Sequence, residues 1–544
     1  MEQKVLISSF KSACFYDALT NTWNRLKSMS ISGDVFFCVD YEECTPDPDE
    51  FEVFILPGFI DAHCHIQENP YTVSDCKENT GNECYETLLH NAQKNVITAA
   101  HGGVTTLKDL GGYEYSSVDI AEQITEIPIR VLTSGCYFTC PDGHASDHGA
   151  IIIESIGDFE RGVSKLQSKS IQYCKILHSD NGFTYDFLSR MINLAHEKGM
   201  LVSCHVFTEK AAQDAVLAGA DILEHAGDYS DGLLQQIKDK DLIVVPTYVA
   251  ATDSTPENCE MLGDINEVVL KQWLDGEKAV IPRLFANGIN VALGTDSGFP
   301  GTPCNSLARE IQLLHRDFGI PIEQLLHSAF IVTPRTIRMH DRLGRIATGY
   351  LSDFQCYKRN PLAHVGDLGY PYEVWACGKK IETMIIDSVT IRRLKEPNIQ
   401  DIILYLHNYF FDCGTLNDAW SDEEISSWIR NENDYCSGAF YENEIIGFCL
   451  THYHKQANKV HLENIYVSER YRMRGVANKL LSDAVRHYMR RAPSQLRFVA
   501  LIDCTNIPSI NLLNKCQFMK GHSMYWMQRN ICNDDKGISR MASK

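Results

Sequence analysis

The stretch that decides the fold is residues 56–65, Leu56-Pro57-Gly58-Phe59-Ile60-Asp61-Ala62-His63-Cys64-His65. Its apolar run predicts a buried β-strand that ends in a His-x-His pair. On a strand, side chains two residues apart point to the same face, so His63 and His65 converge while Cys64 faces away. Neutral imidazoles suit zinc and related divalent metals, whereas the alternative for an isolated pair is two buried, hydrogen-bonded histidines. The residues that follow decide between these interpretations.

From about residue 61 to residue 344, short apolar segments alternate with longer amphipathic segments. The clearest expected strands are 171–177, 201–205, 220–225, 242–246 and 289–294. The clearest expected helices are 185–198 and 209–218. This alternation is typical of parallel strands joined by crossover helices. The number of units fits a closed (β/α)8 TIM barrel over residues 61–344, so the predicted fold class is α/β.

The segments on both sides of this barrel are strand-like. Residues 1–60 and 345–388 are expected to pair with each other and to build one small composite β-sandwich domain. A separate module with mixed strands and helices begins near Val389, which predicts a C-terminal α+β domain over 389–532 and a tail over 533–544.

The composition narrows the class of protein. A chain of 544 residues is too long for one ordinary core, and 44% hydrophobic with 22% charged residues is typical of a soluble globular protein. The net charge of −21 argues against partners such as nucleic acid or an anionic membrane surface. Without a spanning segment or a signal-peptide pattern, the twenty cysteines are expected to stay reduced in the cytoplasm. A homo-oligomer is compatible with the sequence, which does not decide the oligomeric state.

Several metal-ligand residue types lie at the ends of successive expected strands. These residues are His63, His65, Lys175, His205, His225 and Asp296. In a barrel enzyme the C-terminal strand ends meet in the active site. Each residue taken singly has a structural alternative, because a histidine can cap a loop, a lysine can form an ion pair and an aspartate can cap a helix. All of them in this order favour a metal site.

This order resembles the metal-dependent amidohydrolase superfamily, closest to its imidazolonepropionase-like and Xaa-Pro dipeptidase-like branch. The resemblance spans residues 1–388 and rests on 57–65, the strand lysine, the two single histidines, and the runs Gly103-Val104-Thr105-Thr106, Gly294-Thr295-Asp296 and Gly344-Arg345-Ile346-Ala347-Thr348-Gly349. It implies that CO2 carboxylates Lys175 and that the resulting carbamate bridges two divalent metal ions, with zinc as the expected metal. By the same resemblance, His63, His65 and Asp296 hold one metal, and His205 and His225 hold the other.

The resemblance implies hydrolysis of an amide bond in a small-molecule or peptide-like substrate by metal-bound hydroxide; an ester or lactone is less favoured. Two metals about 3.5–4 Å apart lower the pKa of a bridging water. Asp296 would accept a proton from this water and deliver it to the leaving amine. His144 is a candidate catalytic and substrate-binding residue and Tyr248 a candidate substrate-binding residue, with a loop histidine and a packed tyrosine as the alternatives.

Two other functions are compatible with the barrel. A mononuclear deaminase of the same superfamily typically has a glutamate three residues after the histidine that corresponds to His205, where this chain has Thr208 and then Glu209. A binding protein with a decayed barrel is disfavoured because every metal position is filled. The lysine on the bridging strand favours the binuclear hydrolase.

A second motif lies at residues 465–481, where a strand leads into an arginine-rich turn with Gly475 and then into a helix. Exposed backbone N–H groups at a helix start bind phosphate, and Gly475 allows close approach of the backbone. One loop of this kind is a weak signal, and a plain turn is the alternative. A hairpin over 437–449 upstream and the segment 506–518 downstream strengthen it.

Together these segments resemble the GNAT family of N-acetyltransferases over residues 389–532. The resemblance implies that acetyl-CoA is bound by Val467, Arg472, Arg474, Gly475, Val476, Ala477 and Asn506. Glu463 on the preceding strand is a candidate catalytic base. Leu513 and Gln517 stand where many relatives have a tyrosine and a glycine, which puts transfer activity in doubt. The whole chain is therefore interpreted as a bifunctional enzyme, and the alternative for its C-terminal module is a non-catalytic acyl-CoA sensor or docking domain.

Overall fold

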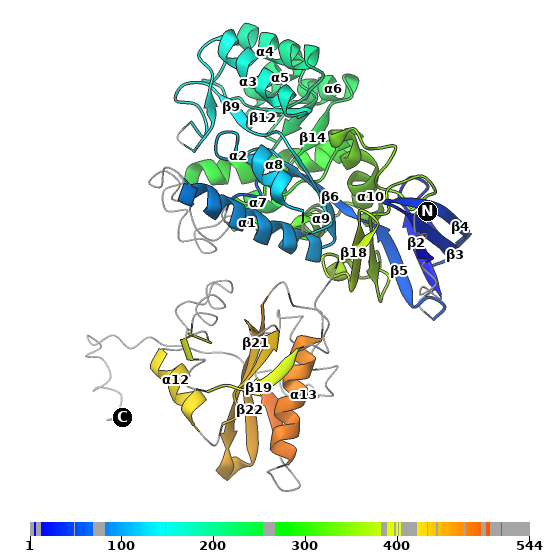
Figure 1. The fold of residues 1–544 in the computed structure, drawn as a ribbon, viewed down its shortest axis with the longest axis vertical. Coiled ribbons are helices and arrows are strands. Elements are labelled where there is room, and N and C mark those ends of the chain that lie inside the picture. The colour runs from blue at the N-terminus through cyan, green and yellow to red at the C-terminus, as the bar shows by residue number, and fades with distance from the viewer. Residues whose placement is uncertain are drawn as a thin grey trace, which may run out of the picture. The chain divides into compact units, whose positions relative to one another are not determined.

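The computed structural model forms two compact units that divide between Ser388 and Val389 (Figure 1). The residues that it describes are 5–6, 12–47, 49–68, 82–125, 127–146, 148–253, 267–299, 301–381, 389–395, 399–400, 402–403, 422–431, 434–441, 444–468, 471, 475–490, 497–500 and 513.

The first unit contains a closed ring of parallel strands. One run pairs β6 (Phe59–Cys64), β7 (Val104–Asp109) and β8 (Arg130–Thr133). The second run has the order β10 (Ile151–Ile152), β9 (Tyr137–Thr139), β11 (Tyr173–Leu177), β12 (Leu201–His205), β13 (Ile222–Glu224), β14 (Ile243–Val245) and β15 (Asn290–Val291). β9 follows β8 directly in the chain, and the Ala62 N–H donates to the Leu293 carbonyl at 3.0 Å. This bond beside β15 joins the two runs at one seam, and the arrangement is that of the predicted TIM barrel.

Helices cover the outside of the ring. They are α1 (Asn82–His101), α2 (Ser116–Gln123), α3 (Ile156–Ser168), α4 (Tyr185–Glu197), α5 (Glu209–Ala218), α6 (Asp231–Asp239), α7 (Tyr248–Asp253), α8 (Glu267–Ala286), α9 (Leu307–Phe318) and α10 (Ile322–His327). A π-helix over Ser328–Val332 and 3-10 helices over Thr333–Ile337 and Val365–Asp367 follow. Ser155, Thr184, Thr208 and Ser230 begin four of the helices, because each hydroxyl accepts an N–H of the first turn.

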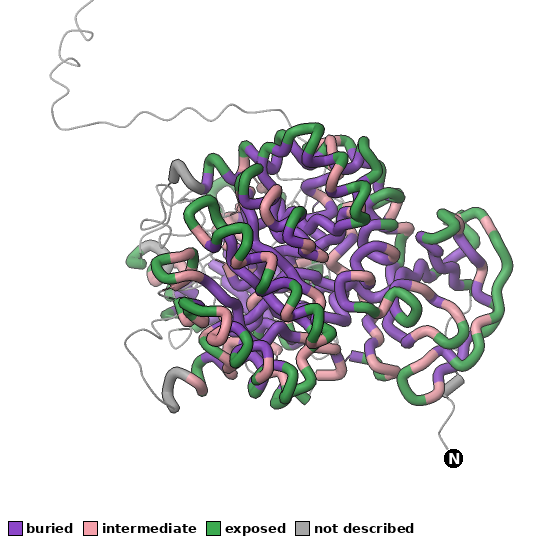
Figure 2. Tube along the Cα trace, turned by 90° about the horizontal axis from the view of Figure 1, so that it is seen from above, coloured by how far each residue is buried: buried purple, intermediate pink, exposed green. Residues whose placement is uncertain are grey.

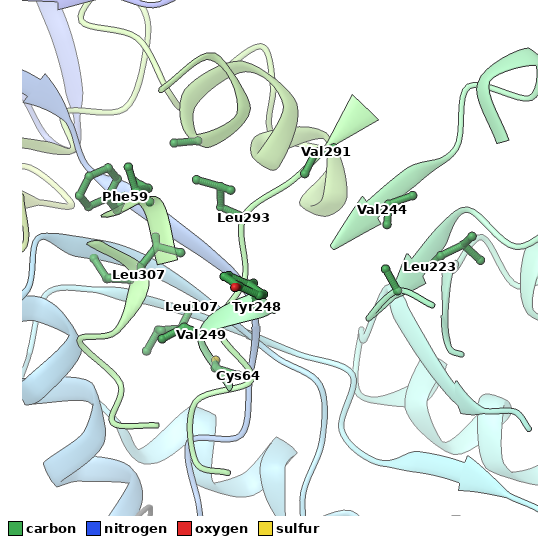
Figure 3. Close-up of a cluster of buried hydrophobic side chains, with 14 of the residues drawn as sticks. Phe59, Cys64, Leu107, Leu223, Val244, Tyr248, Val249, Val291, Leu293 and Leu307 are labelled. Atoms are coloured by element: carbon green, nitrogen blue, oxygen red, sulfur yellow. The ribbon is translucent and has the colours of Figure 1, made fainter. Parts of the chain in front are cut away.

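The core of the first unit lies between the strands and these helices. Every residue of β11 is buried, as expected of parallel strands covered on both faces. Figure 2 shows buried segments in the interior and exposed segments on the outer turns. Figure 3 shows part of the core, where Phe59, Leu107, Val249 and Leu293 are buried near the strand ends.

A sheet beside the barrel is built from both ends of the first unit. Its strands are β1 (Val5–Leu6), β2 (Ala13–Asp17), β3 (Thr22–Ser32), β4 (Val35–Cys44), β5 (Val53–Pro57), β16 (Phe354–Tyr357), β17 (Glu373–Ala376) and β18 (Lys379–Ile381). β5 pairs antiparallel with β16, so the chain returns to its N-terminal strands after the barrel. The pairing joins all eight strands in one sheet.

The second unit is a five-stranded sheet with helices. Its strands have the order β19 (Thr390–Arg393), β20 (Ser437–Tyr441), β21 (Glu444–His454), β22 (Lys459–Val467) and β23 (Arg497–Ala500). The helices described are α12 (Asp422–Arg430), α13 (Val476–Met489) and a 3-10 turn over Lys455–Ala457. All neighbouring strands are antiparallel except β22 and β23, so the predicted α+β class is confirmed.

No helix in the described parts of the chain is long and apolar enough to cross a membrane.

A buried ion pair ties the barrel to the sheet beside it. Arg130 in β8 donates to Thr106 Oγ1 and to Asp353 Oδ2, each at 2.9 Å. The other carboxylate oxygen of Asp353 accepts the Cys377 N–H at 2.9 Å, in the turn between β17 and β18. The Asp353 side chain is only 2% exposed, so little water can replace its partner. The pair therefore fixes the return of the chain against the barrel.

We expect Arg130→Met to lower the free energy of unfolding by about 3 kcal/mol, because Asp353 would stay buried without its cation. The double variant Arg130→Met/Asp353→Asn should lose less than the sum of the two single variants, since it leaves no unpaired charge. Thermal unfolding of the full chain measures both. If the unfolding transition of the first unit is unchanged in Arg130→Met, the ion pair adds no stability.

Candidate active site

The C-terminal ends of the barrel strands hold the predicted metal ligands. His63 lies in β6 and His65 directly after it; Lys175, His205 and His225 lie in or after β11, β12 and β13. Asp296 follows β15 in the chain. His225 and Asp296 have φ angles of 65° and 54°. Such left-handed backbone is uncommon outside glycine and costs free energy, and it is concentrated at functional sites.

Small residues and backbone bonds bring Asp296 to the histidine pair. A Cβ atom at Gly294 would lie 2.8 Å from the Cβ atom of His63, so only glycine allows this approach. The N–H groups of Thr295 and Asp296 both donate to the His63 carbonyl, at 3.1 and 2.8 Å. The buried Asp61 carboxylate also accepts the Thr295 hydroxyl at 2.6 Å. The two strand ends are therefore locked together.

The first candidate metal group is His63, His65 and Asp296, whose ligand atoms all lie within 4.8 Å of one another. The Nε2 atoms of His63 and His65 each lie 3.2 Å from Asp296 Oδ1. The other ring nitrogens are occupied, because His63 Nδ1 faces Glu224 at 2.9 Å and His65 Nδ1 donates to the Gly111 carbonyl at 2.8 Å. These outer partners leave Nε2 of both rings toward the shared site.

The second candidate group is Lys175, His205 and His225. The imidazole centroids of His205 and His225 lie 4.5 Å apart, and that of His225 lies 4.9 Å from His63. Burial lowers the pKa of both His205 and His225 well below the usual range, so both rings are neutral and have a lone pair for a metal. His225 Nδ1 bonds to Thr247 Oγ1 at 2.8 Å, which leaves its Nε2 as the ligand atom.

Lys175 is buried and its ammonium nitrogen has no hydrogen-bond partner among the described residues. Burial lowers the pKa of Lys175 to about 8, so an appreciable fraction of its amine is neutral near neutral pH. A neutral amine can react with CO2, whereas an ammonium cannot. An unpaired buried ammonium is costly, so the site fits a modified or ligand-bound lysine better than a bare one.

Glu224 and Lys108 were not predicted from the sequence. Glu224 in β13 contacts His63 Nδ1, and its other oxygen lies 3.6 Å from Lys108 Nζ in β7. Lys108 also donates to Ser203 Oγ at 3.0 Å. Burial alone would raise the pKa of Glu224, but the charges of His63 and Lys108 outweigh it and lower that pKa below its usual range. Glu224 is therefore a fixed anion behind the first metal group.

The two predicted substrate residues have different surroundings. The ring of His144 stacks on that of His205 with centroids 4.5 Å apart, so His144 lies next to the candidate metal ligands. Burial lowers the pKa of His144, which keeps it neutral. Tyr248 begins α7, is fully buried in the hydrophobic cluster of Figure 3, and its hydroxyl lies 3.1 Å from Asp317 in α9. Since that hydroxyl already has a partner, we leave Tyr248 out of the substrate site proposed below.

An aromatic group that the sequence did not single out packs against these histidines. Phe207 lies 4.4 Å from His205 and 4.8 Å from His225, measured between ring centroids. Trp273 in α8 packs on Phe207 at 5.3 Å and on Phe299 at 6.0 Å. This aromatic wall, Phe207, Trp273 and Phe299, lowers the polarity around His205 and His225.

The predicted acyl-CoA residues are only partly described. Gly475, with a φ of 83°, is the N-cap of α13, and Val476 and Ala477 form its first turn. Val467 ends β22, and Glu463 lies in that strand. Leu513 is buried. Arg472, Arg474, Asn506 and Gln517 lie outside the described residues.

Comparison with known families fits both sites. A model described as "Amidohydrolase family" matches residues 54–390, which is more than half of the chain. The chain belongs to the amidohydrolase family. This membership supports a hydrolase acting on carbon–nitrogen bonds. A second model, "Acetyltransferase (GNAT) family", matches residues 403–518, so the C-terminal part holds a GNAT domain.

Individual relatives are distant. An ochratoxinase of Aspergillus niger is 21% identical over 364 residues, covering 60% of this chain and 75% of the relative. A 5-methylthioadenosine/S-adenosylhomocysteine deaminase of Caldanaerobacter subterraneus subsp. tengcongensis is 21% identical over 388 residues, covering 64% and 83%. The crystal structure of a Xaa-Pro dipeptidase with bound methionine in its active site superposes with a TM-score of 0.61 at 19% identity, covering 70% of this chain and 100% of that chain. At this identity the structural likeness establishes the fold.

We expect Glu224→Gln to weaken metal binding about 10–100-fold, because it removes the anion that orients His63 from behind. Metal content after dialysis against a chelator measures the loss. Exposed Glu197 provides a matched control, and Glu197→Gln should keep its metal. Equal metal retention by both variants would rule out a role for Glu224 in the metal group.

Proposed function

We propose that the barrel hydrolyses an amide bond of a small peptide-like or N-acyl substrate with the help of two divalent metal ions. The observation that supports this most directly is Lys175, a buried amine without a partner among the described residues. Its charge acts on the neutral rings of His205 and His225, and the charge of Asp296 acts on it. A site with these groups is poorly stable unless something fills it.

The donor set fits two zinc ions. His63, His65 and Asp296 would hold one ion, His205 and His225 the other, and a carboxylated Lys175 would contribute one oxygen to each. Carboxylation turns a cation that repels metals into an anion that binds them. When bound, the metals would supply Lewis acidity toward the substrate carbonyl and lower the pKa of a water between them.

Asp296 is the residue that we assign to proton transfer. Burial opposes its ionisation, but His63 and His65 outweigh this and hold the pKa of Asp296 well below its usual range. The carboxylate is therefore ionised at neutral pH and can accept a proton from water at Oδ2, because Oδ1 faces the two imidazoles. The same oxygen would return that proton to the leaving amine.

His144 is assigned to the substrate. Its neutral ring lies beside His205 and can donate one hydrogen bond to a carbonyl or carboxylate at the mouth of the site. The aromatic wall provides an apolar surface for a side chain of the substrate. A Xaa-Pro dipeptidase, which by its name acts on dipeptides, shares the fold of the barrel, and we therefore take a peptide-like amide as the substrate class.

A mononuclear deaminase is the second candidate, since a curated deaminase is among the relatives. Such an enzyme needs an acid near His205. Thr208 caps α5 by accepting the Ala211 N–H, and Glu209 is exposed and bonded to the Ser230 N–H. Neither residue offers a buried acid at the site, so the binuclear hydrolase is favoured.

We expect Lys175→Ala to lose at least half of the bound metal and to lower amide hydrolysis by several orders of magnitude, because the bridge between the metals is gone. Metal analysis and a screen of dipeptides, N-acyl amino acids and lactones measure the two effects. Added short-chain carboxylates should restore part of the activity, since they can supply the missing oxygens.

The other buried lysine provides the matched control. Lys108→Met also removes a buried amine, but one that has Glu224 and Ser203 as partners, so carboxylates should not rescue it. Full activity and metal content in Lys175→Ala would contradict the bridged site, and deamination without hydrolysis would favour the second candidate.

We propose further that the GNAT domain binds acetyl-CoA and transfers its acetyl group to an amine. Gly475 has left-handed backbone at the start of α13 and provides no side-chain cap there, and a helix start of this kind can bind a pyrophosphate. Glu463 would accept the proton of the attacking amine. The alternative is an acyl-CoA sensor without transfer, for which the buried Leu513 in place of a tyrosine is the argument.

We expect Gly475→Glu to abolish acetyl-CoA binding in isothermal titration of the full chain, because a carboxylate repels the pyrophosphate and strains a backbone at φ 83°. Gly438→Ala, in β20, is a control for a glycine change elsewhere in the same domain. Binding by wild type without acetylation of the amines that the barrel releases would support the sensor. Wild-type affinity in Gly475→Glu would exclude this loop.

A further inference from the structure

Three histidines lie on one face of the β21–β22 hairpin in the second unit. The register places His452 directly opposite His461. His454 is two residues after His452 and therefore points to the same face. The ring centroids of His452 and His454 are 4.4 Å apart, and those of His454 and His461 are 4.7 Å apart. The three imidazoles thus form one contiguous group at the end of the hairpin.

A carboxylate completes this group. The ladder shifts by one residue where Leu450 pairs with Asn464 and Thr451 pairs with Leu462, so Glu463 is the extra residue of a β-bulge. A bulge redirects the side chain, and it brings Glu463 to the histidines. Ligand atoms of His454, His461 and Glu463 all lie within 4.8 Å of one another.

This donor set suits a divalent transition metal. Two imidazoles and a carboxylate are a ligand combination typical of zinc sites with an open position. Tetrahedral zinc with bonds of about 2.0–2.2 Å needs ligand atoms roughly 3.3–3.6 Å apart, so a group whose atoms lie within 4.8 Å of one another must contract by at most about 1.5 Å. His454 is exposed, and His461 and Glu463 are partly exposed, so their side chains can make this movement.

The fourth member of the group is held by a second carboxylate. His452 Nδ1 lies 2.9 Å from Asp434 Oδ2, and the Asp434 side chain is completely buried. The other oxygen of Asp434 accepts the Tyr453 N–H at 2.9 Å, and Asn431 donates to Oδ2 at 2.8 Å. A buried carboxylate that fixes Nδ1 and leaves Nε2 outward is the arrangement found behind metal-binding histidines.

We propose that this hairpin face is a second metal site, which binds one zinc-like divalent ion through His454, His461 and Glu463 with His452 as a fourth donor. It is independent of the barrel, because all of its residues belong to the GNAT domain. One feature of the surroundings opposes a cation: Lys459 pairs with His454 and lies on the same face. Lys459 is partly exposed, so solvent and salt screen its charge.

The test is a titration of the metal-stripped full chain with zinc against a chromophoric chelator. We expect His454→Ala/His461→Ala to take up one equivalent less than wild type while its amide hydrolysis in the barrel is unchanged. Asp434→Asn should weaken the same equivalent about 10–100-fold. Lys459→Ala, a matched change on the same hairpin, should bind it at least as tightly as wild type because a neighbouring positive charge is removed.

Equal zinc uptake and affinity in wild type and the double histidine variant would overturn the proposal. Loss of the equivalent in Lys459→Ala would overturn it too, because uptake would then depend on the hairpin and not on its donors. Neither result bears on hydrolysis in the barrel, so failure of this site and failure of the barrel mechanism are distinguishable.

Discussion

The seam between β6 and the segment Leu293–Asp296 is the constraint on which the first unit depends. The bond from the Ala62 N–H to the Leu293 carbonyl joins the first and last strands of the barrel, and the His63 carbonyl accepts the N–H groups of Thr295 and Asp296. These bonds are geometrically possible because Gly294 has no side chain to strike His63. The same contacts that close the barrel also place Asp296 at the two imidazoles. The fold of the barrel and the first candidate metal group therefore depend on the same contacts. A substitution that breaks these contacts would disrupt both the barrel and the group.

The two buried lysines of the barrel, Lys108 and Lys175, have different surroundings. Glu224 contacts His63 at 2.9 Å and lies 3.6 Å from Lys108, so this buried anion has a cation beside it. Lys175, on the neighbouring strand to Ser203, has no such partner among the described residues. The Lys108 amine has a carboxylate and a hydroxyl beside it, whereas the Lys175 amine has only the charges of Glu224 and Asp296 nearby and no hydrogen bond among the described residues. This difference is the reason that we propose Lys175, and not Lys108, as the lysine that reacts with CO2 and binds metal.

The sequence predicted the architecture and the strand-end residues because both follow from local patterns. A histidine at the end of an apolar strand indicates which end of that strand carries the functional residue. Parallel strands in a barrel bring these C-terminal ends together. Glu224 and Lys108 were not predicted because each is a single charged residue near the end of its strand, and their pairing depends on which strands face each other across the barrel. The role of Tyr248 in substrate binding stays a prediction; its hydroxyl lies 3.1 Å from Asp317 in α9, a contact between distant segments that the local sequence does not indicate. The aromatic wall could not be predicted from the sequence because its residues lie far apart in the chain.

Glu463 connects the two proposals for the second unit. As a general base it must offer a lone pair to the proton of an attacking amine, whereas as a ligand it would donate that lone pair to a cation. The bulge places Glu463 beside His454 and His461, so a metal held there would occupy the carboxylate that the amine needs. A metal on the hairpin would also place positive charge where the amine must lose a proton and attack. The two roles are therefore exclusive at any moment, and the occupancy of the hairpin would set the fraction of the domain able to transfer an acetyl group.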